Sequence, residues 1–117
     1  ALPESIGNLN KLTKLNLEDH QLKSLPKTIG LMTGLTKLNL SQNDLQTLPV
    51  SIGNLTNLEE LDLGFNNNLK MIPESIKNLL PTLKKLVIPE HFEELIDEMY
   101  KDLGLDSFNI VCLTCSN

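Results

Sequence analysis

The sequence contains no arginine and no tryptophan, and it has only one tyrosine and one alanine in 117 residues. All ten basic residues are lysines, and the formal net charge is −5. Nucleic-acid-binding domains carry a basic surface, and arginine is the side chain that grips phosphate with two hydrogen bonds. An acidic chain without arginine therefore predicts no nucleic-acid partner.

Long apolar runs and a cysteine framework are also missing. No apolar segment approaches the roughly 18 residues of a membrane-spanning helix, so no membrane span is expected. Cys112 and Cys115 are the only cysteines, whereas small secreted domains usually carry more. Their C-x-x-C spacing could serve redox chemistry or zinc, but redox chemistry favours a helix start after a strand, and zinc needs two further ligands. We interpret the pair as incidental thiols, and metal analysis of the purified protein would test this.

Leucine is the abundant residue, with 26 copies, and leucine, isoleucine, valine and phenylalanine together make up 40 residues. A core built largely from one side chain indicates a repetitive architecture. Leu-Pro pairs begin at residues 2, 25 and 48, and Ile72-Pro73 follows 24 residues later. Each unit then continues with the same pattern, which in the second unit is Leu35, Leu38, Leu40, Asn43 and Leu45.

The pattern L-x-x-L-x-L-x-x-N-x-L resembles the signature of leucine-rich-repeat proteins over about residues 2–88. The whole unit, L-P-x-x-I-G-x-L-x-x-L-x-x-L-x-L-x-x-N-x-L, is similar to the 23-residue type of intracellular scaffolds and of bacterial proteins that include secreted effectors. The resemblance implies an α/β solenoid: a right-handed superhelix with four parallel strands on the concave face and short helical turns on the convex face. It also implies a cytoplasmic location, or the host cytosol for a secreted bacterial effector.

The L-x-L step has a period of two, so it predicts strands near 13–17, 36–40, 59–63 and 84–88 with leucines pointing inward. The prolines suit the first position of each helical turn, where no backbone N–H is needed. Asn43 and Asn66 fit an inward turn position, where an amide can satisfy backbone groups. His20 holds the same place in the first repeat, and we interpret it as a turn residue with the asparagine role rather than as a pH switch.

The period changes at Pro89, which divides the chain into repeats at 1–88 and a C-terminal cap at 89–117. The spacing of Phe92, Leu95, Ile96, Met99 and Leu103 predicts an amphipathic helix that stops at Gly104. A short strand is predicted at 108–113. The cap carries seven acidic residues against one lysine, and we interpret this acidic face as a solvated cover for the last repeat, although it could also dock a basic partner.

Function is expected on the outward positions of the strands and of the turns that follow them. These positions form columns whose members lie about 5 Å apart, and Lys37, Glu60 and Lys85 are expected to neutralise one another. Val87 and Pro89 complete two of the columns. The candidate partner-binding residues are Lys14, Asn16, Glu18, Lys37, Asn39, Gln42, Glu60, Asp62, Phe65 and Lys85. Phe65 is an aromatic residue at an otherwise polar position, and it is either an anchor for a partner or a side chain that packs locally.

These features favour a non-catalytic protein-interaction module. The sequence shows no nucleophile–base set, no paired-carboxylate motif and no phosphate loop, so no catalytic, cofactor or metal site is expected. The alternatives are a substrate-targeting or autoinhibitory repeat domain of a larger effector enzyme, and a redox or zinc protein that uses the two cysteines. Nothing in the sequence covers the upstream face of the first repeat, so we expect either further repeats upstream or self-association through this end.

Overall fold

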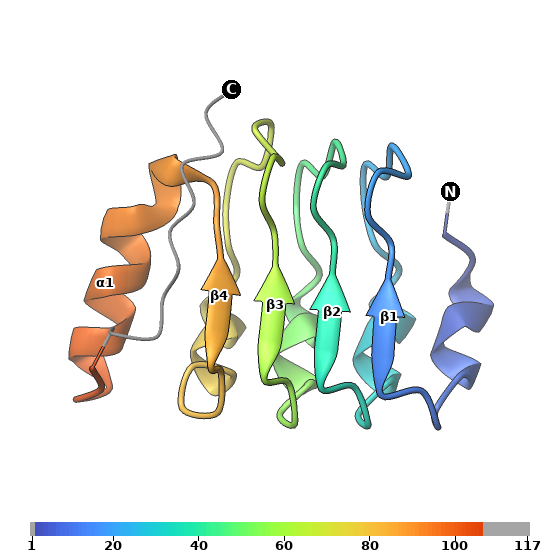
Figure 1. Ribbon diagram of the computed structural model, residues 1–117, viewed down its shortest axis with the longest axis horizontal. Coiled ribbons are helices and arrows are strands. Elements are labelled where there is room, and N and C mark those ends of the chain that lie inside the picture. The colour runs from blue at the N-terminus through green and yellow to red at the C-terminus, as the bar shows by residue number, and fades with distance from the viewer. Residues whose placement is uncertain (1, 107–117) are drawn as a thin grey trace.

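The computed structural model describes residues 2–106. Four short strands alternate with 3-10 helical turns, and an α-helix lies at the far end (Figure 1). The strands are β1 (Lys14–Asn16), β2 (Lys37–Asn39), β3 (Glu60–Asp62) and β4 (Lys85–Val87). The 3-10 turns are η1 (Glu4–Asn8), η2 (Lys27–Leu31), η3 (Val50–Asn54), η4 (Glu74–Asn78) and η5 (Glu90–Phe92), and the α-helix is α1 (Glu93–Asp102). We call each of η1 to η4, together with the strand that follows it, a coil, numbered as its strand.

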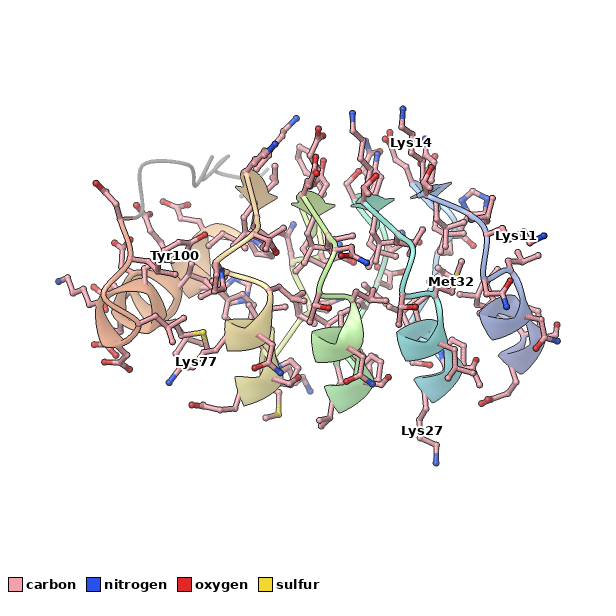
Figure 2. The ribbon with its side chains drawn as sticks, turned by 90° about the horizontal axis from the view of Figure 1, so that it is seen from below. Lys11, Lys14, Lys27, Met32, Lys77 and Tyr100 are labelled. Carbon is pink, nitrogen blue, oxygen red and sulfur yellow. The ribbon has the colours of Figure 1, made fainter. Side chains whose placement is uncertain are left out.

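The strands form one parallel sheet in the order β1-β2-β3-β4, which confirms the solenoid. The register pairs Lys14 with Lys37, Lys37 with Glu60, and Glu60 with Lys85, as the 23-residue step predicts. Parallel crossovers are right-handed in nearly all proteins, so the superhelix takes that hand. The sheet lies on one side and the 3-10 turns on the other (Figure 2). The prolines sit one position earlier than predicted: each is the extended residue immediately before a turn.

Leucines from the strands and isoleucines from the turns meet in one continuous core. The inward leucines Leu38, Leu61 and Leu86 are buried, as the alternation predicts. Close stacking of the coils depends on glycine. A Cβ atom on Gly53 would lie 2.5 Å from the backbone oxygen of Ser75 in the next coil. Since no side chain fits there, the glycines of η1, η2 and η3 set how closely the next coil approaches.

Two buried asparagines join the coils where the strands end. The Oδ1 atom of Asn43 accepts the backbone N–H groups of His20 and Leu22, at 3.0 and 2.9 Å. Its amide nitrogen donates to the carbonyl oxygens of Leu17, Leu40 and Ser41. One coil later, Asn66 Oδ1 accepts the N–H of Leu45, and its amide nitrogen donates to the carbonyl oxygens of Leu40, Leu63 and Gly64. The predicted inward role of both asparagines is therefore confirmed.

The prediction that His20 takes over this asparagine role is wrong. His20 is exposed, and its Nδ1 atom contacts only the carbonyl oxygen of Glu18, at 2.7 Å. Asn43 bridges coil 2 to backbone groups of coil 1. In the described structure His20 has no coil ahead of coil 1 whose backbone groups it could bridge in the same way. The equivalent position in the fourth repeat is also a histidine. The Nε2 atom of His91 lies 2.8 Å from the carbonyl oxygen of Leu69.

The C-terminal helix is present, and Phe92, Ile96 and Met99 of the predicted apolar stripe are buried. α1 buries Ile96, Met99 and Tyr100, whereas Leu95 and Leu103 are exposed. The buried stripe is centred between Ile96 and Tyr100, so Leu95 falls to its side, and Leu103 lies beyond the last helical turn. Gly104 ends the helix with a φ of 67°, as predicted. The backbone N–H of the next residue closes the end by donating to the carbonyl oxygen of Tyr100 at 2.9 Å.

A lysine joins the helix to the last coil. The Nζ atom of Lys77 lies 2.8 Å from Glu74 and 3.5 Å from Asp102 in α1. The hydrogen bond to Glu74 raises the pKa of Lys77 above its usual value. Burial in turn raises the pKa of Tyr100, because the phenolate would be poorly solvated there. The helix therefore covers the C-terminal side of coil 4 as a cap, while the division into domains at residue 88 stays a prediction.

Two predictions concern residues outside the described part. The strand at 108–113 and the roles of Cys112 and Cys115 fall beyond residue 106. Between residues 2 and 106 no helix is long and apolar enough to cross a membrane.

Candidate protein-interaction surface

The outward side chains of all four strands line a shallow hollow of about 300 Å³. Its floor is formed by the strand leucines, and its walls come from the predicted columns. Figure 2 shows Lys14 projecting on this side of the sheet, and Lys27 projecting on the opposite side, among the 3-10 turns. Seven of the ten candidate residues line the hollow: Lys14, Asn16, Lys37, Asn39, Glu60, Asp62 and Lys85. We call this hollow the strand face.

The strand-end residues of this face also shape the backbone. The side-chain Oδ1 atoms of Asn16, Asn39 and Asp62 each accept the N–H of the residue two positions later, at 2.9 to 3.0 Å. Contacts of this kind shape the turn that follows each of these three strands. Only the amide nitrogens of Asn16 and Asn39 and the second carboxylate oxygen of Asp62 are left to contact a partner. Of these, the amide nitrogen of Asn39 also donates to Glu18 at 3.0 Å.

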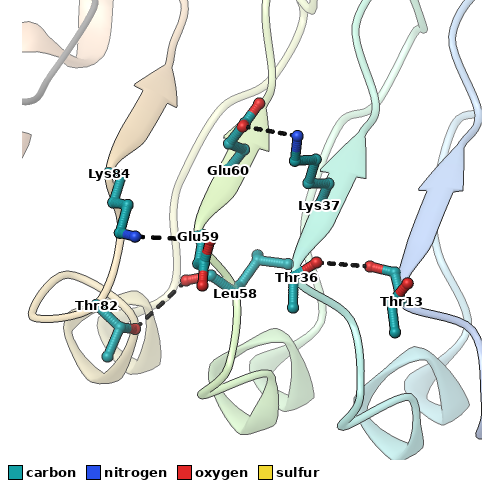
Figure 3. Close-up of polar contacts among 8 residues, drawn as sticks. All are labelled: Thr13, Thr36, Lys37, Leu58, Glu59, Glu60, Thr82 and Lys84. Carbon is teal, nitrogen blue, oxygen red and sulfur yellow. Dashed lines mark hydrogen bonds and ion pairs between the residues drawn. The ribbon is translucent and has the colours of Figure 1, made fainter.

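Charge on the strand face is partly neutralised between strands. The Nζ atom of Lys37 lies 3.2 Å from Glu60 (Figure 3). Lys85 was expected to join this pair. It does not: among the described residues the ion pair at this end of the sheet is made instead by Lys84, the residue before β4, whose Nζ atom lies 3.8 Å from Glu59. Such exposed pairs contribute at most about 1 kcal/mol each. Within residues 2–106, Lys14 and Lys85 make no ion pair, and they lie at the two ends of the same column.

The prediction that the outward columns continue onto the end of β4 is wrong. Val87 is 1% exposed, and Pro89 is also buried. Both side chains are apolar and lie at the capped end of the sheet, so their removal from water is favourable. Lys85 is the last residue of the strand face on that side.

A second, larger groove lies where the chain leaves the strands. It encloses about 510 Å³ and is lined by Asp19, Gln21, Gln42, Asn43, Asp44, Phe65 and Asn67. Two of the candidate residues, Gln42 and Phe65, belong here rather than to the strand face. Glu18 links the two sites, because its carboxylate accepts from Asn39 at 3.0 Å and from Gln42 at 3.4 Å. We call this second site the rim groove.

The rim groove contains residues that the sequence interpretation did not select. Gln21, Asp44 and Asn67 look like ordinary loop residues. Each follows the asparagine position of its repeat, which is His20, Asn43 or Asn66, and only this position could have marked them. Asp19 and Asp44 give the groove a negative charge, and no basic residue lines it. The rim is therefore acidic, whereas the strand face has lysines at the other ends of the strands.

Phe65 has an unusual backbone conformation. Its φ is 58°, in the left-handed region, as are those of Asp19 and Gln42 at the same position of their coils. Residues with a bulky side chain rarely adopt this conformation, which costs about 1–2 kcal/mol. Phe65 is nevertheless 43% exposed. A strained aromatic residue that keeps its ring in solvent is poorly explained by packing alone, and such strain often marks a functional position.

We expect Phe65→Asn to leave the free energy of unfolding unchanged or to raise it by up to about 1 kcal/mol, because asparagine tolerates the left-handed region. Chemical denaturation monitored by circular dichroism would measure this. Gln42→Asn is the matched control, since Gln42 has the same backbone conformation without an aromatic ring. A loss of more than 1 kcal/mol in the Phe65 variant alone would assign the ring to local packing.

The described residues offer no evident place for a metal ion. Between residues 2 and 106 no three histidine, cysteine, aspartate or glutamate side chains come together in a group that could hold one. Every buried side-chain polar atom in this part of the chain has a hydrogen-bond partner within the protein.

Parallel strands above 3-10 turns, with buried asparagines between coils, define the class of protein as a leucine-rich-repeat solenoid. A family model described as a leucine-rich repeat region matches residues 1–110. The chain belongs to this family. Proteins of the family are generally non-catalytic modules that bind protein partners.

Two solved structures show the similarity in detail. A leucine-rich-repeat protein of Leptospira interrogans is 40% identical, with a TM-score of 0.69, over 74% of this chain and 22% of its own. The plant peptide hormone receptor RGFR1, solved in complex with RGF2, is 38% identical, with a TM-score of 0.64, over 76% of this chain and 15% of its own. The chain therefore spans less than a quarter of the length of either neighbour. A comparison with curated protein sequences gave no significant match.

Proposed function

We propose that the chain is a non-catalytic protein-interaction module whose partner lies on the strand face and reaches the rim groove. The observation that carries the proposal is Phe65, an exposed aromatic residue in a strained conformation that lines the rim groove. Aromatic residues, phenylalanine included, are enriched at the core of protein interfaces. The plant neighbour was solved with RGF2 bound to it, which supports a ligand-binding role for this kind of repeat.

Charge gives the partner its orientation. Lys14 and Lys85 are cations on the strand face, whereas Asp19 and Asp44 make the rim groove acidic. A complementary partner presents acidic groups to the starts of the strands, and basic or aromatic groups to the rim. Opposite charges arranged in this way mainly set the orientation and the association rate of a complex.

Area limits the affinity of the strand face. Four strands about 5 Å apart, with about five residues at 3.3 Å each, project roughly 300 Å². A stable interface buries about 800 Å² on each partner. The rim groove adds surface beyond the ends of the strands, and we propose that a partner contacts both sites together.

A photo-crosslinking amino acid placed at Asn16 tests the proposal in extracts of the cells that produce the protein. We expect a defined protein adduct that is weakened at least tenfold by Phe65→Asn. The matched control is the same probe at Lys27, which projects from the opposite side of the molecule (Figure 2). The same adduct from both probes, or an adduct insensitive to Phe65, would contradict the proposal.

The second candidate function is a substrate-targeting or autoinhibitory repeat domain within a larger effector enzyme. It is favoured by one observation, the much greater length of both structural neighbours. The same surfaces would serve this role, with the partner being a substrate or the enzyme itself. For either function we propose a cytoplasmic location, or the host cytosol if a bacterium exports the protein.

The N-terminal end also supports a weak self-association. Leu9 and Leu12 are exposed next to the open edge of β1, and an open strand edge with apolar neighbours favours pairing between chains. Sedimentation velocity from 1 to 100 micromolar is expected to show a rising sedimentation coefficient, and Leu12→Lys is expected to abolish the rise. A single monomeric species across this range would contradict the expectation.

A further inference from the structure

The rim groove is built by three successive loops, which follow β1, β2 and β3 and stand side by side beyond the strand ends (Figure 1). The loops line the groove with two rows of side chains, each with a 23-residue step. The first row, at the left-handed backbone position, consists of Asp19, Gln42 and Phe65. The second row consists of Gln21, Asp44 and Asn67. Asp44 therefore belongs to the loop between the one that carries Asp19 and the one that carries Phe65.

The two carboxylates of the groove have no partner in the described part of the chain. Asp19 and Asp44 are exposed, and between residues 2 and 106 neither side chain makes a hydrogen bond or an ion pair. Lys23 and Lys70 follow groove residues closely in the sequence, but neither lines the groove or pairs with its carboxylates. The groove thus holds two negative charges that no ion pair among the described residues neutralises.

Hydrogen bonds within the protein leave mainly acceptors in the groove. The side chain of Asn43 is buried, and both its oxygen and its nitrogen are bonded to backbone groups. The amide nitrogen of Gln42 donates to Glu18 at 3.4 Å, which leaves its carbonyl oxygen available. The amides of Gln21 and Asn67 can serve as donors or acceptors. A ligand with positive charge and several donors therefore complements the groove.

Phe65 adds an aromatic face next to these acceptors. The residue is 43% exposed, and the face of an aromatic ring attracts a cation within about 6 Å of its centre. A guanidinium group is planar and always charged, stacks on aromatic rings, and binds a carboxylate through two N–H groups. The ammonium group of lysine is more strongly hydrated and has no flat surface to stack. Among natural side chains, arginine thus fits both the ring and the carboxylates best.

We propose that the rim groove is a binding site for an arginine side chain of a protein partner, with the guanidinium group on the ring of Phe65 and hydrogen-bonded to Asp44. The inference rests on the proposed function, because it names the group with which the partner reaches the rim. Asp19 lies two coils from Phe65, about 10 Å at the strand spacing, and adds attraction at longer range. The strand face does not suit this group, since Lys14 and Lys37 line it.

The test uses the whole 117-residue chain, isotope-labelled for NMR spectroscopy, and blocked Gly-X-Gly tripeptides as probes. The peptide with arginine is expected to shift the backbone amides of Asp19, Asp44 and Asn67, with a dissociation constant in the millimolar range. Citrulline has the shape of arginine without its charge, and its peptide is expected to bind at least about fivefold more weakly. The lysine peptide is expected to bind at least about threefold more weakly than the arginine peptide.

Two variants assign the binding to the groove. Asp44→Asn and Phe65→Asn are each expected to weaken the arginine peptide at least about threefold and to leave the citrulline peptide unchanged, since they remove a charge partner and the ring. Glu98→Gln is the matched control, because it removes one negative charge from α1, away from the groove. It is expected to change the affinity by less than about 1.5-fold, since exposed charges beyond about 10 Å are screened.

Four results would overturn the inference: equal binding of the arginine and citrulline peptides, equal binding of the arginine and lysine peptides, shifts centred on the strand face, or no binding up to about 50 millimolar peptide. The crosslinking experiment at Asn16 separates this inference from the proposed function. A specific, Phe65-dependent adduct without arginine selectivity overturns the arginine site alone. An arginine-selective groove with the same adduct from the probes at Asn16 and Lys27 overturns the proposed strand-face partner and leaves the arginine site in place.

Discussion

Replacing Asn66 by alanine is expected to cost roughly 3–4 kcal/mol of unfolding free energy, because its amide satisfies four backbone groups in the core and each group left unpaired costs about 1–3 kcal/mol. Asn66 is 0% exposed. Its Oδ1 atom accepts one N–H, and its amide nitrogen donates to three carbonyl oxygens at 2.9 to 3.2 Å. These carbonyls belong to coils 2 and 3, so the loss affects the joint between the coils. Urea denaturation followed by circular dichroism measures the change.

The neighbouring asparagine provides the control. Asn67 is the next letter of the same three-residue run, but it is exposed. Asn67→Ala is expected to change the free energy of unfolding by less than about 0.5 kcal/mol. Equal losses for the two variants would show that the asparagine run acts as a unit, contrary to the single inward amide described above.

Leu38→Ala is expected to destabilise the protein by about 2–5 kcal/mol, because the leucine is almost wholly buried and its removal leaves a cavity between coils. The adjacent Lys37 points outward on the same strand. Lys37→Ala is expected to cost under about 0.5 kcal/mol, since it removes only an exposed ion pair with Glu60. Thermal melts of both variants check the contrast. Similar shifts would mean that the inward and outward faces of β2 have been exchanged.

Most of the fold follows from one number, the 23-residue step. Because the step is constant, it places Lys14, Lys37 and Glu60 side by side, and the structure has this register. It also makes Leu38 and its equivalents inward residues. Repeats are predictable in this way because each unit buries its apolar face on its neighbours, so the same letters must recur wherever the same contact does.

The ends of the solenoid were less predictable, since there the repeated contact is missing. His20 was assigned the asparagine role by its position, but the buried asparagines bridge their own coil to the preceding one, and His20 has no such contact. Val87 was assigned to the solvent by its register, although it lies at the capped end of the sheet. In α1 the helical period identified a buried stripe but not which of Leu95 and Tyr100 belongs to it. That choice depends on how the helix lies across coil 4.

The candidate surface was predictable in its positions but not in its chemistry. Register alone brings the columns together on one face. It does not reveal that Asn16, Asn39 and Asp62 use half of their side chains on their own backbone. Nor does it reveal the left-handed conformation of Phe65. Both features depend on backbone dihedral angles at the strand ends, and several residue types are compatible with more than one such conformation.

The hydrogen bonds that join one coil to the next have a consequence for folding kinetics. Each of them links residues about one repeat apart: Thr28 to Glu4, Thr36 to Thr13, and Asn43 to Leu22 are separated by 24, 23 and 21 residues. The entropy of closing a loop grows only with the logarithm of its length, and here the loop length is the same for every coil. Lengthening the solenoid therefore adds no contacts between residues that are farther apart in the sequence. After the first two coils have met, each further coil is expected to join at a similar rate, whatever the total length of the chain.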